Sequence, residues 1–465
     1  MDKLIDPLAR QLTTRLKEAG FRPEQIVADK VLRTCYGYDA TRQSAAPLLA
    51  LLPENELQVQ TILKLATEKN LKIFPRGAGS GMSGGAIPSA DGIILSLTRM
   101  RRILEIDEDN MIATVEPGVV TGDLQEEVDK FGLFYPPDPA SLAFSTIGGN
   151  VTENAGGPRA VKYGVTGNFV MGLEAYLING EKITCGNKCI KSVSGYDLTS
   201  LLVGSEGTLA VITKILLKLL PAPETVKTSL LAFSSMTAAA HAVNAMFKYQ
   251  INPSTIEFLD HHSINAVRSE LPFALPEAAD TVLLVELDGP EAQVENQSLK
   301  LNKLFKNDTL LLIAAKDESE REQLWLARRK LSPAIANIAP HKINEDIAVP
   351  LAAIPKVISN LEELSREINL PIVCFGHAGD GNIHVNVMLD KNDPDQAERG
   401  RKGIDEIFAI TLEAGGTLSG EHGIGNTKSA YFDKEWDPVT IATMRAVKKA
   451  FDPDNRLNPG KIFPV

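Results

Sequence analysis

Five glycines fall between positions 77 and 85, and this glycine run constrains the possible folds more than any other feature. Gly79, Gly81 and Gly84 have the GxGxxG spacing of dinucleotide-binding loops, and a predicted strand precedes them. That fingerprint also requires a helix directly after the loop. Here the chain continues through Pro88 into a second predicted strand, so we exclude a Rossmann unit. The pattern instead predicts a loop whose backbone N–H groups can surround an anion.

A second constraint is the turn at residues 378–382, with the sequence AGDGN. Asp-Gly and Gly-Asn pairs favour tight reversals of the chain. After the turn, apolar residues alternate with His384 and Asn386, which predicts a strand with these two side chains on one face, opposite the packed face. His377 lies just before the turn and can reach round to His384.

Glu421 and His422 follow in a glycine-flanked loop, where neighbouring side chains need not point in opposite directions. With His377 and His384, Glu421 would complete a set of two imidazoles and one carboxylate, which suits a divalent ion with open positions for a substrate. His422 is then a candidate proton acceptor, because histidine titrates near neutral pH. The alternative is two structural histidines and a capping glutamate. The occurrence of HxGDGNxH together with a later GEHG is a more specific indication of a metal site than either motif alone.

Charge and cysteine content exclude several classes of protein. The formal net charge is -11 and no Lys/Arg-rich run occurs, which argues against nucleic acid as a partner. No apolar run is long enough for a transmembrane segment, so we expect a cytoplasmic protein that can still be peripheral to a membrane complex. The four cysteines include one close pair, Cys185 and Cys189, which disfavours structural zinc or an iron–sulfur cluster. An electron carrier would therefore be organic.

The Pro221-Ala-Pro223 stretch is the predicted domain boundary. Beyond it, strands and helices alternate with short links, which predicts a compact α+β sheet with helices on one face. A predicted helix at 320–338 carries Arg328, which could clamp a carboxylate in a bidentate pair. Taken alone, a solvated helix face is the better interpretation of that arginine.

Seven motifs occur in a fixed order along the chain: Arg76–Gly85, Pro137–Ser141, Gly148–Gly157, Gly204–Gly207, Gly376–His384, Gly420–Gly423 and Leu457–Gly460. Together they resemble the FAD-linked D-2-hydroxyacid dehydrogenases. That group includes D-lactate dehydrogenase, the FAD subunit of glycolate oxidase and D-2-hydroxyglutarate dehydrogenase, within the vanillyl-alcohol oxidase/p-cresol methylhydroxylase superfamily. The resemblance extends over nearly the whole chain.

The resemblance implies an α+β protein in three parts. Residues 1–221 would form a two-subdomain FAD-binding domain of the p-cresol methylhydroxylase type. Residues 222–415 would form an α+β cap domain with an antiparallel sheet, and residues 416–465 a C-terminal segment returning to the FAD domain. The implied FAD-binding residues are Arg76, Gly77, Ala78, Gly79, Ser80, Gly81, Gly84, Pro137, Asp138, Ser141, Gly148, Gly149, Asn154, Gly156, Gly157, Gly207, Ile212 and Asn458. Some relatives attach FAD through a histidine, but the first histidine here is His241, so we expect noncovalent FAD.

The resemblance also implies a divalent metal, zinc, iron or manganese, on His377, His384 and Glu421. His422 would be the catalytic base that also contacts the substrate, and Arg328 and Asn386 would lie near the substrate carboxylate. The implied reaction takes a small 2-hydroxy acid to the 2-oxo acid, with hydride transfer to flavin N5. Electrons would pass to an external acceptor such as electron-transferring flavoprotein or an iron–sulfur subunit.

One position departs from part of that group. D-2-hydroxyglutarate enzymes carry a lysine shortly after the arginine helix, and Asn344 stands at that position here. The missing cation favours a monoacid, D-lactate or glycolate, although Lys342 lies two residues away. Three alternatives stay open: a D-2-hydroxyglutarate dehydrogenase, a flavin oxidase for another alcohol, and a non-catalytic FAD electron-transfer subunit.

Overall fold

The structure is a computed structural model that describes residues 6–463, so the predicted domain ends at 1–5 and 464–465 lie outside the described residues. The described chain divides into two compact units. The first comprises residues up to Gly156, Val165–Pro221, and the chain from His422 onward. The second comprises Gly157–Gly164 and Ala222–Glu421. The return to the first unit thus begins at His422 and not at 416, and the short 157–164 excursion into the second unit was not predicted.

One sheet of the first unit has the strand order β1-β2-β4-β3. Its strands are β1 (Ile26–Val27), β2 (Leu49–Leu51), β3 (Ile73–Arg76) and β4 (Ile93–Ser96). Helices α1 (Pro7–Glu18) and α3 (Glu56–Glu68) bury leucines and isoleucines in the same core as this sheet. Residues 77–92, between β3 and β4, form turns and irregular backbone and no helix. The exclusion of a Rossmann unit is therefore confirmed.

A second, antiparallel sheet of the first unit has the order β5-β6-β10-β8-β9. Its strands are β5 (Ile103–Asp107), β6 (Ile112–Val115), β8 (Val170–Tyr176), β9 (Lys182–Gly186) and β10 (Val211–Lys218). The other elements that bear on the site are α4 (Thr121–Asp129), α5 (Ile147–Glu153), α7 (Leu198–Leu202) and α15 (Pro438–Phe451). The C-terminal segment reaches β3, where Asn458 N–H donates to the carbonyl of Ile73 at 2.7 Å.

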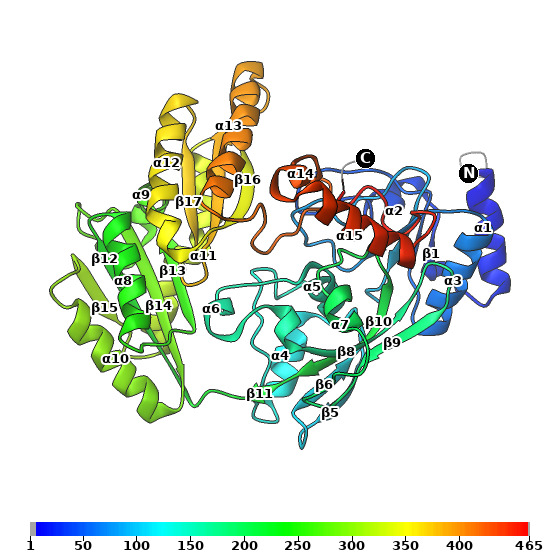
Figure 1. The fold of residues 1–465 in the computed structure, drawn as a ribbon, viewed down its shortest axis with the longest axis horizontal. Helices are drawn as coiled ribbons and strands as arrows, with labels where there is room; N and C mark the ends of the chain where they lie inside the picture. The colour runs from blue at the N-terminus through cyan, green and yellow to red at the C-terminus, as the bar shows by residue number, and fades with distance from the viewer. Residues whose placement is uncertain (1–5, 464–465) are drawn as a thin grey trace. The chain divides into compact units, whose positions relative to one another are not determined.

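The second unit contains an antiparallel sheet in the order β15-β12-β14-β13-β17-β18-β16 (Figure 1). Its strands are β12 (Thr225–Phe233), β13 (Thr255–Leu259), β14 (Thr281–Gly289), β15 (Leu311–Ala314), β16 (His341–Ala348), β17 (Ile372–His377) and β18 (Asn382–Leu389). The predicted antiparallel α+β cap is therefore confirmed.

Helices cover both faces of this sheet, which corrects the prediction of helices on one face. Leu284 of β14 packs in one core with α9 (His261–Val267) and α11 (Glu318–Ala334). Its neighbour Leu283 contacts a cavity shared with α8 (Met236–Lys248) and α12 (Ile354–Glu367). Because successive strand residues point to opposite faces, the two sets of helices lie on opposite sides of the sheet.

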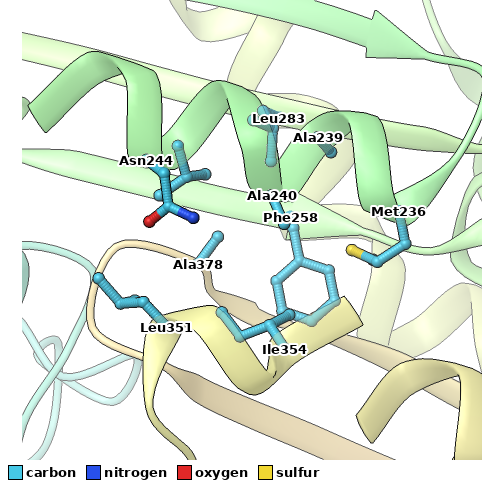
Figure 2. A pocket seen from close by; sticks show the side chains of 10 residues that line it. Met236, Ala239, Ala240, Asn244, Phe258, Leu283, Leu351, Ile354 and Ala378 are labelled. Atoms are coloured by element: carbon cyan, nitrogen blue, oxygen red, sulfur yellow. The ribbon is translucent and has the colours of Figure 1, made fainter. Parts of the chain in front are cut away.

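The cavity on the α8 side is small and apolar, at about 10 Å³. Figure 2 shows Phe258 and Leu283 from the sheet, Met236 and Ala240 from α8, and Ile354 from α12 around it. A volume of this size holds about one water molecule. This cavity therefore has no room for a substrate.

None of the helices formed by residues 6–463 is both long and apolar enough to cross a membrane.

Candidate active site

The three predicted metal ligands come together at the end of β17 and β18. His377 ends β17, and His384 lies in β18 after the turn, with Phe375 as its cross-strand partner. His377 Nε2 lies 3.5 Å from Glu421 Oε1, and His384 Nε2 lies 3.6 Å from the same oxygen. The two rings stand 5.3 Å apart and nearly perpendicular. Both imidazoles are buried.

This arrangement fits a divalent cation. Ligand atoms bound at about 2.1 Å in tetrahedral geometry lie roughly 3.4 Å from each other, close to the separations seen here. His377 Nε2 is buried and forms no hydrogen bond with another described residue. An unpartnered buried nitrogen is costly, and a bound cation would satisfy it.

Electrostatics around His377 favour positive charge. Burial alone would lower the pKa of His377, but the carboxylates of Glu257 and Glu421 outweigh it and raise that pKa well above its usual value. Burial raises the pKa of Glu421, but His377 and His384 lower it by more, so the net shift of that pKa is downward. The carboxylates of Glu257 and Glu421 thus make the surroundings of His377 favourable to positive charge.

Asp346 is an alternative third ligand, because its oxygens lie within 4.8 Å of the ligand atoms of His384 and Glu421. However, Asp346 Oδ2 already accepts hydrogen bonds from Ser419 Oγ, Gly420 N–H and Glu421 N–H at 2.9–3.0 Å. Asp346 Oδ1 accepts another from Asn382 at 2.6 Å. Asp346 is therefore already engaged in holding the loop that carries Glu421, whereas the buried Nε2 of His377 has no hydrogen-bond partner among the described residues.

Glu257 of β13 lies behind His377 and is fully buried. Its Oε1 is hydrogen bonded to His377 Nδ1, and its Oε2 accepts from Arg328 Nε at 2.5 Å. Burial raises the pKa of Glu257, but His377 and Arg328 more than compensate and lower that pKa to about 2. Arg328, whose side chain is 18 % exposed, also stacks with its Cζ 4.8 Å from the centre of the Phe375 ring. Arg328 is therefore held by Glu257 and Phe375 and does not lie on a solvated helix face.

Asn386 is fully buried, which corrects the expectation that its strand has one unpacked face. Its Oδ1 accepts from Asn344 Nδ2 at 2.9 Å, and its Nδ2 donates to the carbonyl oxygens of Val373 and His384. Asn386 and His384 do share a face, since their partners on β16 are Asn344 and Asp346. Contact between Asn386 and a substrate stays a prediction.

His422 is the residue at which the chain re-enters the first unit. Just after it, Ile424 N–H and Gly425 N–H donate to the two carboxylate oxygens of Glu206 at 2.8 and 2.6 Å. Glu206 is buried and has a left-handed φ of 50°, which costs an ordinary residue about 1–2 kcal/mol. The strained backbone is offset by these charge-assisted bonds, which fix the loop that follows His422.

Several predicted FAD-binding segments come together within the first unit. A Cβ at Gly77 would lie 2.2 Å from Thr146 Oγ1, directly before α5, so the glycine loop and the 148–157 segment touch. Asn458 Nδ2 donates to the carbonyls of Gly85 and Glu206 at 3.2 and 2.7 Å. These close approaches need residues without side chains at the glycine positions.

The same region contains buried polar atoms without hydrogen-bond partners among the described residues. They include Ser83 Oγ, Glu153 Oε2, Asn426 Oδ1 and Asn458 Oδ1. The carboxylate and amide oxygens among them are hydrogen-bond acceptors and suit a ligand that presents donors, whereas a phosphate would need the N–H groups of the glycine loop. The other predicted residues occupy varied positions: Arg76 is buried and donates to Tyr38 O, Asn154 caps α5, Ile212 lies in β10, and Gly157 belongs to the second unit.

Glu257, Asp346 and Glu206 were not identified from the sequence. A charged residue within the apolar run Ile256–Leu259 is a signal that could have revealed Glu257, because a buried carboxylate needs a partner. No local signal links Asp346 or Glu206 to the loop at 419–425.

Comparisons with known proteins agree with this architecture. Residues 47–186 match the FAD binding domain family, and residues 222–462 match the family described as FAD linked oxidases, C-terminal domain. The chain is 42% identical over 443 residues to glycolate oxidase subunit GlcD of Bacillus subtilis (strain 168), covering 95% of this chain and 94% of the relative. It is 32% identical over 453 residues to D-lactate dehydrogenase of Anaerostipes hadrus, covering 95% of each.

Among solved structures, p-cresol methylhydroxylase with substrate bound matches with a TM-score of 0.81 at 18% identity, covering 99% of this chain and 98% of that one. At this identity the match establishes the fold alone. The two family matches, and the relatives that align over most of the chain, establish the family as well. The chain belongs to the FAD-linked oxidoreductases, in the group of glycolate oxidase subunit GlcD, D-lactate dehydrogenase and D-2-hydroxyglutarate dehydrogenase.

Proposed function

We propose that the protein is an FAD-dependent dehydrogenase that oxidises a small D-2-hydroxy acid, D-lactate or glycolate, to the 2-oxo acid. The observation that carries the proposal is the convergence of His377 and His384 on one oxygen of Glu421, with Arg328 joined to the carboxylate behind His377. A cation site and a guanidinium held by one network suit a substrate with a hydroxyl beside a carboxylate.

Each proposed role follows from the side chain concerned. Glu257 engages Arg328 through Nε, which leaves the terminal NH₂ groups to bind a substrate carboxylate in a bidentate pair. His422 accepts the proton of the substrate hydroxyl as a general base. When bound, a divalent ion (zinc, iron or manganese) supplies Lewis acidity toward that hydroxyl, and noncovalent FAD supplies the hydride acceptor.

The direct test is anaerobic mixing of the FAD-loaded protein with D-lactate, glycolate, L-lactate and D-2-hydroxyglutarate. We expect D-lactate or glycolate to bleach the flavin, L-lactate to leave it oxidised, and chelator treatment to stop the bleaching until metal is restored. A flavin that stays oxidised with all four acids would contradict the proposal. Bleaching without any partner protein would exclude a merely electron-carrying subunit.

D-2-hydroxyglutarate is the second candidate substrate, because Lys342 lies on the same face of β16 as Asn344. Their partners on β18 are Met388 and Asn386, two residues apart, so the two side chains share one side of the strand. A lysine there could replace the missing cation for the second carboxylate. Turnover of D-2-hydroxyglutarate above that of D-lactate, abolished by Lys342→Met, would favour this candidate.

We also propose that the electrons leave to an external acceptor, either electron-transferring flavoprotein or an iron–sulfur subunit. The described cysteines are free and scattered, and the relative from Bacillus subtilis is named as a subunit. An artificial dye should support turnover, whereas oxygen alone should yield little peroxide. Stoichiometric peroxide would instead favour an oxidase.

A further inference from the structure

We propose that Glu257 is a positioning residue that orients two groups at once: the imidazole of His377, proposed to bind the metal, and the guanidinium of Arg328, proposed to bind the substrate. The inference rests on the proposed function, because it concerns the same site. Glu257 Oε1 is hydrogen bonded to His377 Nδ1, and Glu257 Oε2 to Arg328 Nε. One buried carboxylate therefore connects a metal ligand to the arginine assigned to the substrate.

The cost of burying Glu257 explains why both partners are needed. The side chain is 0 % exposed, and an unpaired carboxylate there would be strongly unfavourable. Each of its oxygens has one charge-assisted partner. Neither partner can be lost without leaving part of the buried charge uncompensated.

For His377, the bond from Nδ1 fixes both the tautomer and the ring orientation. With the proton on Nδ1, the lone pair of Nε2 points toward Glu421 Oε1, 3.5 Å away. Carboxylates in this position behind a metal-binding histidine strengthen metal binding in other proteins. For Arg328, the bond at Nε and the Phe375 ring against Cζ fix the plane of the guanidinium.

The same sheet contains a matched control. Glu286 of β14 is also buried and also binds an arginine of α11, through Arg321 Nε at 3.1 Å, together with Trp325 and Thr228. Arg321, Trp325 and Arg328 recur at helical spacing, so one face of α11 supplies donors to both carboxylates. Glu286 has no histidine partner among the described residues, and it should therefore stabilise the sheet without affecting the metal.

The test compares Glu257→Gln with Glu286→Gln in the FAD-loaded protein. Zinc affinity is measured by competition with a chromophoric chelator. The KM for D-lactate is measured by steady-state kinetics on the metal-restored enzyme. Glu257→Gln should weaken zinc binding by about 10- to 100-fold and raise the KM. Glu286→Gln should change zinc affinity by less than about threefold, because Glu286 does not lie behind a proposed metal ligand. In a His377→Ala background, Glu257→Gln should cost no further zinc affinity.

Wild-type zinc affinity in Glu257→Gln, or equal losses in the two variants, would overturn the inference. Absence of zinc binding by the wild type would overturn the metal site of the proposed function itself, so the two failures are distinct. If Glu257→Gln does not fold, Glu257→Asp keeps the charge but is too short to reach both partners. It should show an intermediate loss of zinc affinity, and an unchanged value would equally contradict the proposal.

Discussion

At the level of single residues, each imidazole of the candidate metal site has a carboxylate near its far nitrogen. Glu257 hydrogen bonds to His377 Nδ1, while Asp346 Oδ1 lies 3.7 Å from His384 Nδ1. The difference matters because His384 is also fixed by its position in a paired strand, between β16 and β17. His377 ends its strand, and its orientation depends more on the carboxylate.

Replacement of the proposed base tests the chemistry at this scale. We expect His422→Ala to lower the rate of flavin reduction by D-lactate by roughly 100-fold or more, since a positioned general base contributes on that order. FAD content should stay at the wild-type value, because His422 is assigned to proton transfer and not to holding the flavin. Stopped-flow flavin absorbance measures the rate, and near-normal reduction would remove His422 from the mechanism.

Part of this site was predictable from the sequence for a physical reason. A tight turn joins neighbouring strands, so the spacing of His377 and His384 largely determines that their side chains meet. Glu257 lies 120 residues before His377, and only the strand order brings β13 beside β17. Pairing between strands so distant in the chain leaves no local pattern from which to infer it.

At the level of elements, Gly381 is one of the glycines on which the turn between the two histidines depends. Gly381 has a φ of +85°, and a Cβ there would lie 2.0 Å from the carbonyl oxygen of Val349. Gly415 also has a positive φ, +73°, but has no heavy atom of the described residues within 4 Å of such a Cβ. Comparing substitutions at the two glycines therefore separates the cost of a left-handed backbone from the cost of a steric overlap.

We expect Gly415→Ala to cost about 1–2 kcal/mol of unfolding free energy from the left-handed backbone alone. Gly381→Ala adds an overlap with fixed backbone, so its cost should be about 3 kcal/mol or more. It should also weaken zinc binding, because the turn sets the positions of His377 and His384. Urea unfolding of both variants checks the order, and equal losses would show that the turn can shift to make room.

The alternation along β18 correctly placed His384 and Asn386 on one face but wrongly left that face open. The reason is α11, which covers the polar side of the sheet and meets its carboxylates with Arg321, Trp325 and Arg328. A polar strand face normally indicates solvent. Here it indicates a buried network, which only the packing of a helix from elsewhere in the chain reveals.

At the level of the whole molecule, the absence of histidine before His241 bears on how the flavin is held. The loops proposed to bind FAD in the first unit contain buried polar atoms without hydrogen-bond partners among the described residues, and such atoms suit noncovalent binding. We expect acid precipitation to release all of the flavin into the supernatant. Flavin that stays with the denatured chain would show a covalent link through another side chain.

The passage of the chain from the second unit to the first falls between Glu421 and His422, so the proposed metal ligand and the proposed base are joined by one peptide bond. Each side has its own anchor. Asp346 accepts the N–H groups of Gly420 and Glu421, and Glu206 accepts those of Ile424 and Gly425. The two anchors should therefore have separable effects on metal binding and on proton transfer.

We expect Glu206→Gln to lower the rate of flavin reduction, by up to about 100-fold if His422 moves by an ångström, with little change in zinc affinity. A glutamine amide offers one oxygen to two N–H donors, so one of the two bonds is lost. Asp346→Ala should instead weaken zinc binding, because it releases the loop on the Glu421 side. Equal effects of both variants on zinc would mean that the loop moves as one piece and that the two anchors do not act separately.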